Sequence, residues 1–86
     1  FNELEEGKSI LSVFPNPSHG LFHVNFRNVQ SGKMIRVLNI LGTTVFEQTA
    51  TENELLIDLQ DQANGIYFVY LIDDKQTNFV SKLIKE

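Results

Sequence analysis

The sequence has no cysteine and no tryptophan, and only two prolines and five glycines among its 86 residues. Without cysteine, disulfide bonds and thiolate metal sites are excluded. No uninterrupted apolar stretch approaches the roughly 20 residues that a membrane-spanning helix needs. The first residues have neither the basic start nor the apolar stretch of a secretory signal peptide. A chain of 86 residues has room for one small domain. Because it has no disulfide bonds, this domain depends on hydrophobic packing for its stability.

Basic residues are also few, since seven Lys and Arg stand against eleven Asp and Glu, for a formal net charge of −4. The basic residues are scattered rather than grouped in a stripe, so nucleic-acid binding is not expected. Glu3, Glu5 and Glu6 lie together near the start, in a stretch without hydrophobic periodicity. Residues 1–9 are therefore predicted to be a flexible acidic linker. Because the chain does not begin with methionine, we expect it to be a piece of a longer or processed protein.

Short apolar segments make up the rest of the chain, with hydrophobic residues at 42% and seven phenylalanines. Turn-forming residues interrupt them about every 8–12 residues, a spacing typical of β-sandwiches and barrels. In one segment Phe22, Val24 and Phe26 alternate with polar residues, which predicts a half-buried strand. The segment 66–72 is apolar on both faces, so we expect it to lie centrally, covered on both sides or nearly so. The predicted strands are 10–14, 21–26, 34–40, 44–48, 55–59, 66–72 and 77–85, and a turn at 30–33 is predicted between the second and the third.

Seven strands without a credible helix predict an all-β fold, a seven-stranded antiparallel immunoglobulin-like β-sandwich over residues 10–86. The most secure pairing is the hairpin of the last two strands, across a turn at 73–76. An OB-like barrel is the alternative, although such a barrel usually includes a helix.

The two histidines are His19 and His23, and neither has the partners that a metal site needs. A zinc site takes about four converging ligands, whereas here only scattered acidic residues could join a histidine. His19 is predicted to lie in a turn and His23 on the solvent-facing side of a strand. The glycines are dispersed at turns, so no phosphate-binding loop forms. We expect neither a metal nor a cofactor.

Catalytic groups are not assembled in the sequence either. Ser18 is adjacent to His19, but sequence neighbours rarely form a productive nucleophile–base pair. Asp73 and Asp74 could form a carboxylate pair, yet they fall in a predicted hairpin turn, where Asp is common for conformational reasons. No Gly-x-Ser-x-Gly motif occurs. The sequence therefore predicts no catalytic residues.

Three motifs, in order along the chain, go beyond a plain strand pattern. The first is an aromatic-Pro-Asn-Pro-x-x-Gly segment, whose prolines fix φ and remove two backbone donors. The second places an asparagine three residues before a glycine, where its side chain can bond the turn backbone. The third combines a Gly-Ile-Tyr segment with a Lys-Leu-Ile-Lys segment. Their residues are Phe14, Pro15, Asn16, Pro17 and Gly20, then Asn39 and Gly42, and finally Gly65, Ile66, Tyr67, Lys82, Leu83, Ile84 and Lys85.

In this order and spacing, the motifs resemble the type A C-terminal sorting domain of the type IX (Por) secretion system of Bacteroidota, over about residues 10–86. The resemblance implies a non-catalytic secretion signal that directs an N-terminal cargo through the outer-membrane translocon. It implies as partners the translocon with its shuttle and sortase proteins. It also implies passage through the periplasm to the cell surface or the exterior. A sortase cut is expected within or just before residues 1–9.

The motif residues have two interpretations, structural and recognitional. A structural role is favoured for the residues of tight turns, namely Pro15, Pro17, Gly20, Gly42 and Gly65. Recognition is favoured for the exposed parts of the closing hairpin, including Lys82 and Lys85. A free edge on the last strand could pair with a receptor strand. Exposed edges would also permit an edge-paired or swapped dimer.

Two other functions remain open from the sequence. A carbohydrate-binding module would present exposed aromatic side chains, but tryptophan is absent, and Tyr67 and Tyr70 are expected in the core. Each tyrosine hydroxyl would then need a partner, which places it near the end of a sheet. A structural spacer is the other possibility, and its cargo would be exported equally well without it.

Overall fold

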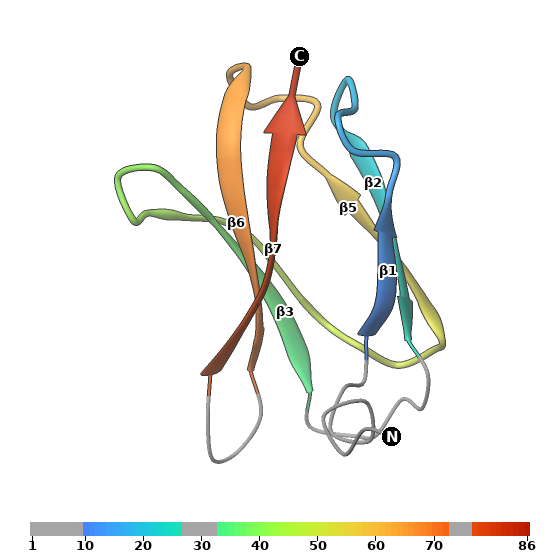
Figure 1. Cartoon of the computed structure of the whole chain (residues 1–86). Coiled ribbons are helices and arrows are strands. Elements are labelled where there is room, and N and C mark those ends of the chain that lie inside the picture. Colours follow the sequence, from blue (N-terminus) through green and yellow to red (C-terminus); the bar gives the residue numbers. More distant parts are fainter. Residues whose placement is uncertain (1–9, 27–32, 73–76) are drawn as a thin grey trace, which may run out of the picture.

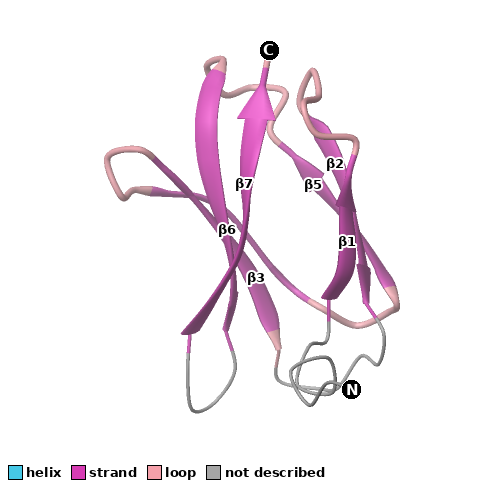
Figure 2. Ribbon diagram, in the orientation of Figure 1, coloured by secondary structure: helices cyan, strands magenta, loops and turns pink. Residues whose placement is uncertain are grey.

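Two β-sheets packed face to face form the domain (Figure 1). The computed structural model describes residues 10–26, 33–72 and 77–86, and these contain strands and loops but no helix (Figure 2). The strands are β1 (Ile10–Phe14), β2 (Leu21–Phe26), β3 (Met34–Asn39), β4 (Thr44–Thr49), β5 (Glu54–Asp58), β6 (Gly65–Ile72) and β7 (Thr77–Lys85).

Strand order identifies the sandwich. One sheet has the order β1-β2-β5 and the other β4-β3-β6-β7. Every pairing between neighbouring strands is antiparallel. Each sheet joins strands that are distant in the sequence, because β2 pairs with β5 and β3 pairs with β6. This confirms the predicted immunoglobulin-like sandwich and makes the OB-like alternative wrong.

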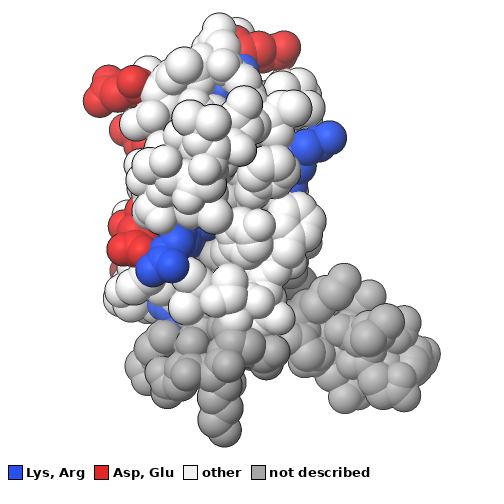
Figure 3. Space-filling view, turned by 90° about the vertical axis from the view of Figure 1, so that its left-hand side faces the viewer, with Lys and Arg blue, Asp and Glu red and all other residues white. Residues whose placement is uncertain are grey.

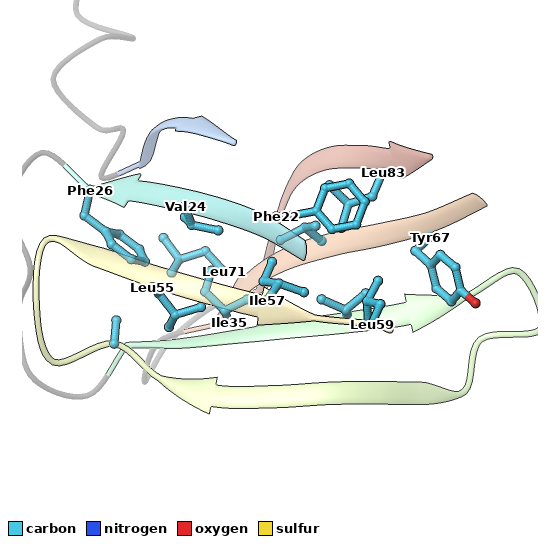
Figure 4. Packing of buried hydrophobic residues seen from close by; sticks show 13 residues of the cluster. Phe22, Val24, Phe26, Ile35, Leu55, Ile57, Leu59, Tyr67, Leu71 and Leu83 are labelled. Carbon is cyan, nitrogen blue, oxygen red and sulfur yellow. The ribbon is translucent and has the colours of Figure 1, made fainter. Parts of the chain in front are cut away.

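The core lies between the sheets and follows the period of two in the strands. In β2, Phe22, Val24 and Phe26 are buried as predicted, because alternate side chains point to one face of a sheet (Figure 4). Both sheets contribute, and the side chains with no exposed surface are Phe22, Val24, Ile35, Val37, Ile57, Leu59, Val69 and Leu83. Burial of such side chains stabilises by about 1.5–3 kcal/mol each.

Strand boundaries differ from the predicted ones by one residue at most. Leu59 shows why such differences arise. It was expected in a strand, but β5 ends at Asp58, and the Leu59 amide donates instead to the carbonyl of Gly20, 2.7 Å away. Its side chain is nevertheless fully buried. Burial alone therefore does not distinguish the last residue of a strand from the first residue of a loop.

The expectation that both faces of β6 would be covered is only half right. The strand is central, between β3 and β7, and Tyr67, Val69 and Leu71 face the core. The opposite face is half-buried, because a two-layer sandwich puts nothing over the outside of a sheet. There Phe68 and Tyr70 contact the ring of Phe79, which is 59% exposed. The expectation that Tyr70 lies in the core is therefore wrong, because alternation along β6 turns it to the face opposite Tyr67. Figure 3 shows this outer face to be largely uncharged.

Three predictions fall outside the described residues: the linker at 1–9, a turn that includes residues 30–32, and the hairpin turn at 73–76. Within the described part, the hairpin of β6 and β7 is confirmed by a register that runs from Gly65 opposite Lys85 to Ile72 opposite Thr77. Among the described residues, no helix has the length and apolarity to span a membrane.

Candidate functional site: the motif end of the sandwich

All three sequence motifs meet at one end of the sandwich, which we call the motif end: residues 14–20, 39–43, 59–67 and 82–86. Asn39 lies opposite Tyr67 in the β3–β6 pairing, and Tyr67 lies opposite Leu83 in the β6–β7 pairing. The middle and closing motifs therefore form one row across the sheet. Figure 1 shows the loop after β1 and the end of β7 at this same end, whereas β1 begins at the opposite end.

Asn16 joins the opening motif to the closing one. Its side-chain amide donates from Nδ2 to the carbonyl of Lys82 at 2.7 Å, and its Oδ1 accepts from the amide of Ile84 at 2.9 Å. One side chain thus pairs with β7 as the backbone of a neighbouring strand would. The prolines on either side cannot donate from their own nitrogens, so the asparagine side chain supplies the donor here.

Ser18 continues this pairing with its backbone. Its amide donates to the carbonyl of Ile84 at 3.0 Å, and its carbonyl accepts from the amide of Glu86 at 2.9 Å, in a parallel bridge. The Ser18 hydroxyl donates to the carbonyl of Leu21 and accepts from the amide of Gly20. Residues 16–18 therefore act as a short extra strand along the last part of β7.

Gly20 is buried where the turn passes against two other segments. Its φ is +137°, and an added Cβ would lie 3.0 Å from the Gln60 Cα and 3.1 Å from the Lys85 Cε. Both the backbone conformation and the space require glycine. Gly42, with φ +87°, has nothing within 4 Å of such a Cβ, so only its conformation matters.

Lys85 was expected among the exposed residues of the closing hairpin, and this expectation is wrong. Only 9% of its surface is exposed, because the loop between β5 and β6 holds its ammonium group. It donates to the carbonyl of Gln62 at 2.6 Å and to Oδ1 of Asn64 at 3.2 Å. The same loop accepts the hydroxyl of Tyr67 at the carbonyl of Ala63, which is the partner expected for a buried tyrosine near a sheet end (Figure 4). Lys85 therefore ties the closing strand to this loop.

The turn after β3 is built on Asn39, as the sequence predicts. Its Oδ1 accepts from the amides of Leu41 and Thr43, at 2.9 and 3.0 Å. The backbone of Asn39 also bonds Gly42 and Thr43. Leu41 itself is 85% exposed, so this turn presents an apolar side chain to solvent.

Exposure divides the motif residues into three sets. The buried set is Gly20, Tyr67, Leu83 and Lys85, and the exposed set is Phe14, Pro15, Asn16, Pro17, Gly42, Gly65, Ile66 and Lys82, with Asn39 and Ile84 half-buried. Within the exposed set, Phe14 stacks on the ring of His23 at 5.5 Å between centroids. Ile66 lies opposite Ile84, and Lys82 lies opposite Phe68, on the outer face.

The potentially reactive side chains at this end form hydrogen bonds with the backbone. The Ser18 hydroxyl bonds two backbone groups rather than a histidine, and Nδ1 of His19 lies 2.9 Å from the Glu86 oxygen. Within residues 10–26, 33–72 and 77–86, no three His, Asp or Glu side chains are grouped as metal ligands would be. The arrangement is one of mutual support between chain segments.

Sequence reasoning missed the contacts of Ser18, Gln62 and Asn64. The partners of Asn16 and Ser18 lie more than 60 positions further along the chain. A polar residue in a turn gives no local signal of so distant a partner. The prolines around Asn16 were the only available hint, because they leave the turn short of backbone donors.

The fold and the site together define a small immunoglobulin-like sandwich whose sequence motifs gather at the end opposite the start of β1. The family described as "Secretion system C-terminal sorting domain" matches residues 12–86. The chain belongs to this family, which confirms the resemblance seen in the motifs.

A relative is the ulvan lyase NLR42 of Nonlabens ulvanivorans. It is 29% identical to the chain over 75 residues, a stretch that makes up 86% of this chain and 14% of that protein. The chain thus matches a small fraction of a much larger protein.

Proposed function

We propose that this domain is a non-catalytic secretion and sorting signal that directs a cargo protein through the type IX outer-membrane translocon. The match of residues 12–86 to the sorting-domain family is the observation that carries the proposal. The small share of the relative's length supports a domain attached to a larger cargo. The cargo then passes through the periplasm to the cell surface or the exterior.

We further propose that the machinery recognises the motif end. A cargo joined before β1 enters at the opposite end, so it leaves the motif end clear (Figure 1). The accessible candidates are Lys82, Ile66 and Ile84, which are neighbours on the outer face of β6 and β7. A charge beside apolar side chains suits a protein partner, whereas buried Lys85 acts through the fold.

A reporter fusion tests both proposals. An export signal, a reporter and residues 1–86 are expressed in a type IX-competent bacterium, and surface exposure of the reporter is measured. The intact domain should carry the reporter to the surface. The matched variants are Lys82→Glu and Ile66→Ser, which change exposed side chains and should reduce display while the isolated domains unfold as wild type does. Normal display of the Lys82→Glu, Ile66→Ser double variant would overturn the recognition patch, and equal display without the domain would favour a spacer.

Cleavage by a sortase is proposed to occur within or just before residues 1–9. The predicted linker precedes β1, the first strand of the folded part. Mass spectrometry of the exported reporter should show a new C-terminus ahead of residue 10. An exported reporter that keeps residues 10–86 would contradict this step.

Carbohydrate binding is a second candidate, favoured by the outward Phe79, which is 59% exposed and contacts Tyr70. Tyr67 takes no part, because it is buried with its hydroxyl bonded to Ala63. A glycan array with the wild-type domain and with Phe79→Ala separates the two functions. Binding that is lost in Phe79→Ala would support this candidate.

A further inference from the structure

The last part of β7 is an edge whose pairing groups are already occupied by residues 16–18, which we call the edge cap. Four backbone groups at the end of β7 and in Glu86, which follows it, point away from β6: the carbonyl of Lys82, the amide and carbonyl of Ile84, and the amide of Glu86. The Asn16 side chain bonds the Lys82 carbonyl at 2.7 Å and the Ile84 amide at 2.9 Å. The Ser18 backbone bonds the Ile84 carbonyl at 3.0 Å and the Glu86 amide at 2.9 Å.

We propose that the edge cap covers a site for β-strand addition, and that its occupant after release is β7 of a second copy of this chain. An uncovered edge strand is a template for pairing with another chain. The four groups are self-complementary when two copies pair antiparallel with Ile84 opposite Ile84. The two Ile84 residues then exchange both amide–carbonyl bonds. Each Lys82 likewise exchanges both bonds with the Glu86 of the other copy.

Charge also fits this register. Lys82 and Ile84 are alternate residues of β7, and Glu86 continues the alternation just after the strand, so the three side chains share a face in the proposed pairing. Lys82 and Glu86 are both exposed. In the proposed pairing each Lys82 lies directly opposite a Glu86 of the other copy, an arrangement that stabilises antiparallel pairs. The contact is isologous, so two copies close it and no open chain of copies forms.

The count of hydrogen bonds explains why the wild-type domain stays capped. Each copy makes four bonds to its own edge cap, and a fifth joins Nδ1 of His19 to the Glu86 carbonyl. Two capped copies therefore hold ten such bonds, whereas the uncapped pair would hold six between them, two at the Ile84 pair and two at each Lys82–Glu86 pair. Asn16→Ala removes both side-chain bonds from each copy, which makes the two counts equal. The edge cap thus prevents pairing between two copies. Its most easily broken bonds are those of Asn16, because this residue is exposed.

Sedimentation over a range of concentrations tests the proposal. Asn16→Ala should associate into dimers at least about tenfold more tightly than wild type, a change of about 1.4 kcal/mol. Asn39→Ala is the matched control, since it removes two turn bonds of an asparagine without uncovering β7. It should stay as monomeric as wild type. Dispersed amide resonances establish that each variant is folded.

Charge variants test the register itself. Adding Lys82→Glu to Asn16→Ala places Glu opposite Glu and should reverse the dimerisation, and adding Glu86→Lys as well should restore it. A folded Asn16→Ala that stays monomeric, or that dimerises regardless of these charges, would overturn the proposal. If Asn16→Ala does not fold, Asn16→Asp serves instead, because it keeps the acceptor for Ile84 and loses only the donor to Lys82. Folded Asn16→Asp without dimerisation would count against the proposal equally.

Discussion

At the residue scale, Gly20 and Gly42 both have positive φ but differ in their surroundings. Gly20 lies within contact distance of Gln60 and Lys85, whereas Gly42 has open space around it. The sequence marks both as turn glycines in motifs. It does not show that only Gly20 is also a packing position, since the two neighbours come from other parts of the chain.

Gly20→Ala should lower the free energy of unfolding by about 2–4 kcal/mol, because backbone strain and a close contact act together. Gly42→Ala should cost about 1–2 kcal/mol from conformation alone. Urea unfolding of both variants measures the difference. Equal losses in the two variants would mean that the contacts around Gly20 relax without cost.

The oxygen of the Asn39 side chain should account for the whole effect of that residue. Asn39→Ala loses the two bonds to Leu41 and Thr43 and should destabilise by about 1–2 kcal/mol. Asn39→Asp keeps an acceptor in the same place and should lose less than about 0.5 kcal/mol. Urea unfolding again decides, and an Asp variant as unstable as the Ala variant would contradict this account.

At the scale of elements, β7 is held on both sides at its end: by β6, and by the edge cap of residues 16–18. The prediction of a free edge on the last strand was therefore wrong for this part of β7. This part of the edge is covered because Pro15 and Pro17 have no backbone donors, and the Asn16 side chain pairs with β7 in their place. The hairpin with β6, by contrast, followed from two adjacent apolar segments.

Replacing each of the two lysines of β7 should show which one supports the fold and which one is free to take part in recognition. Lys85→Ala leaves the carbonyl of Gln62 and the side chain of Asn64 without their charged donor, and should cost about 2–3 kcal/mol. Lys82→Ala, at an exposed position, should stay within about 0.5 kcal/mol of wild type. Thermal unfolding gives both values. A Lys82 variant as unstable as the Lys85 variant would show that Lys82 also supports the fold.

At the scale of the whole molecule, the domain is small, and such a domain buries only about 60–65% of the surface of its unfolded chain. Each strand therefore contributes a large part of the core. β7 supplies fully buried Leu83, the pairing with β6 and the support for the edge cap.

Deletion of residues 77–86 should unfold the domain, and not only remove residues that the secretion machinery recognises. Near-ultraviolet circular dichroism and amide dispersion should both be lost. A chain that lacks residues 1–9 instead is the control and should keep both signals. If the chain without 77–86 stays folded, β7 is not essential to the core. Until that is measured, failed export of this truncation would not locate the recognition site, and point variants on exposed residues are the sharper test.

The sequence alone determined the strands, the buried face of β2, the β6–β7 hairpin and the family, because all of these depend on local periodicity and on motifs in order. Only the tertiary structure decided that Asn16 and Ser18 occupy the edge of β7, that Lys85 is buried while Lys82 is exposed, and that one face of β6 stays open. These features depend on which distant segments meet at the motif end, and the hydrogen-bonding groups of a turn do not reveal their partners until the chain has folded.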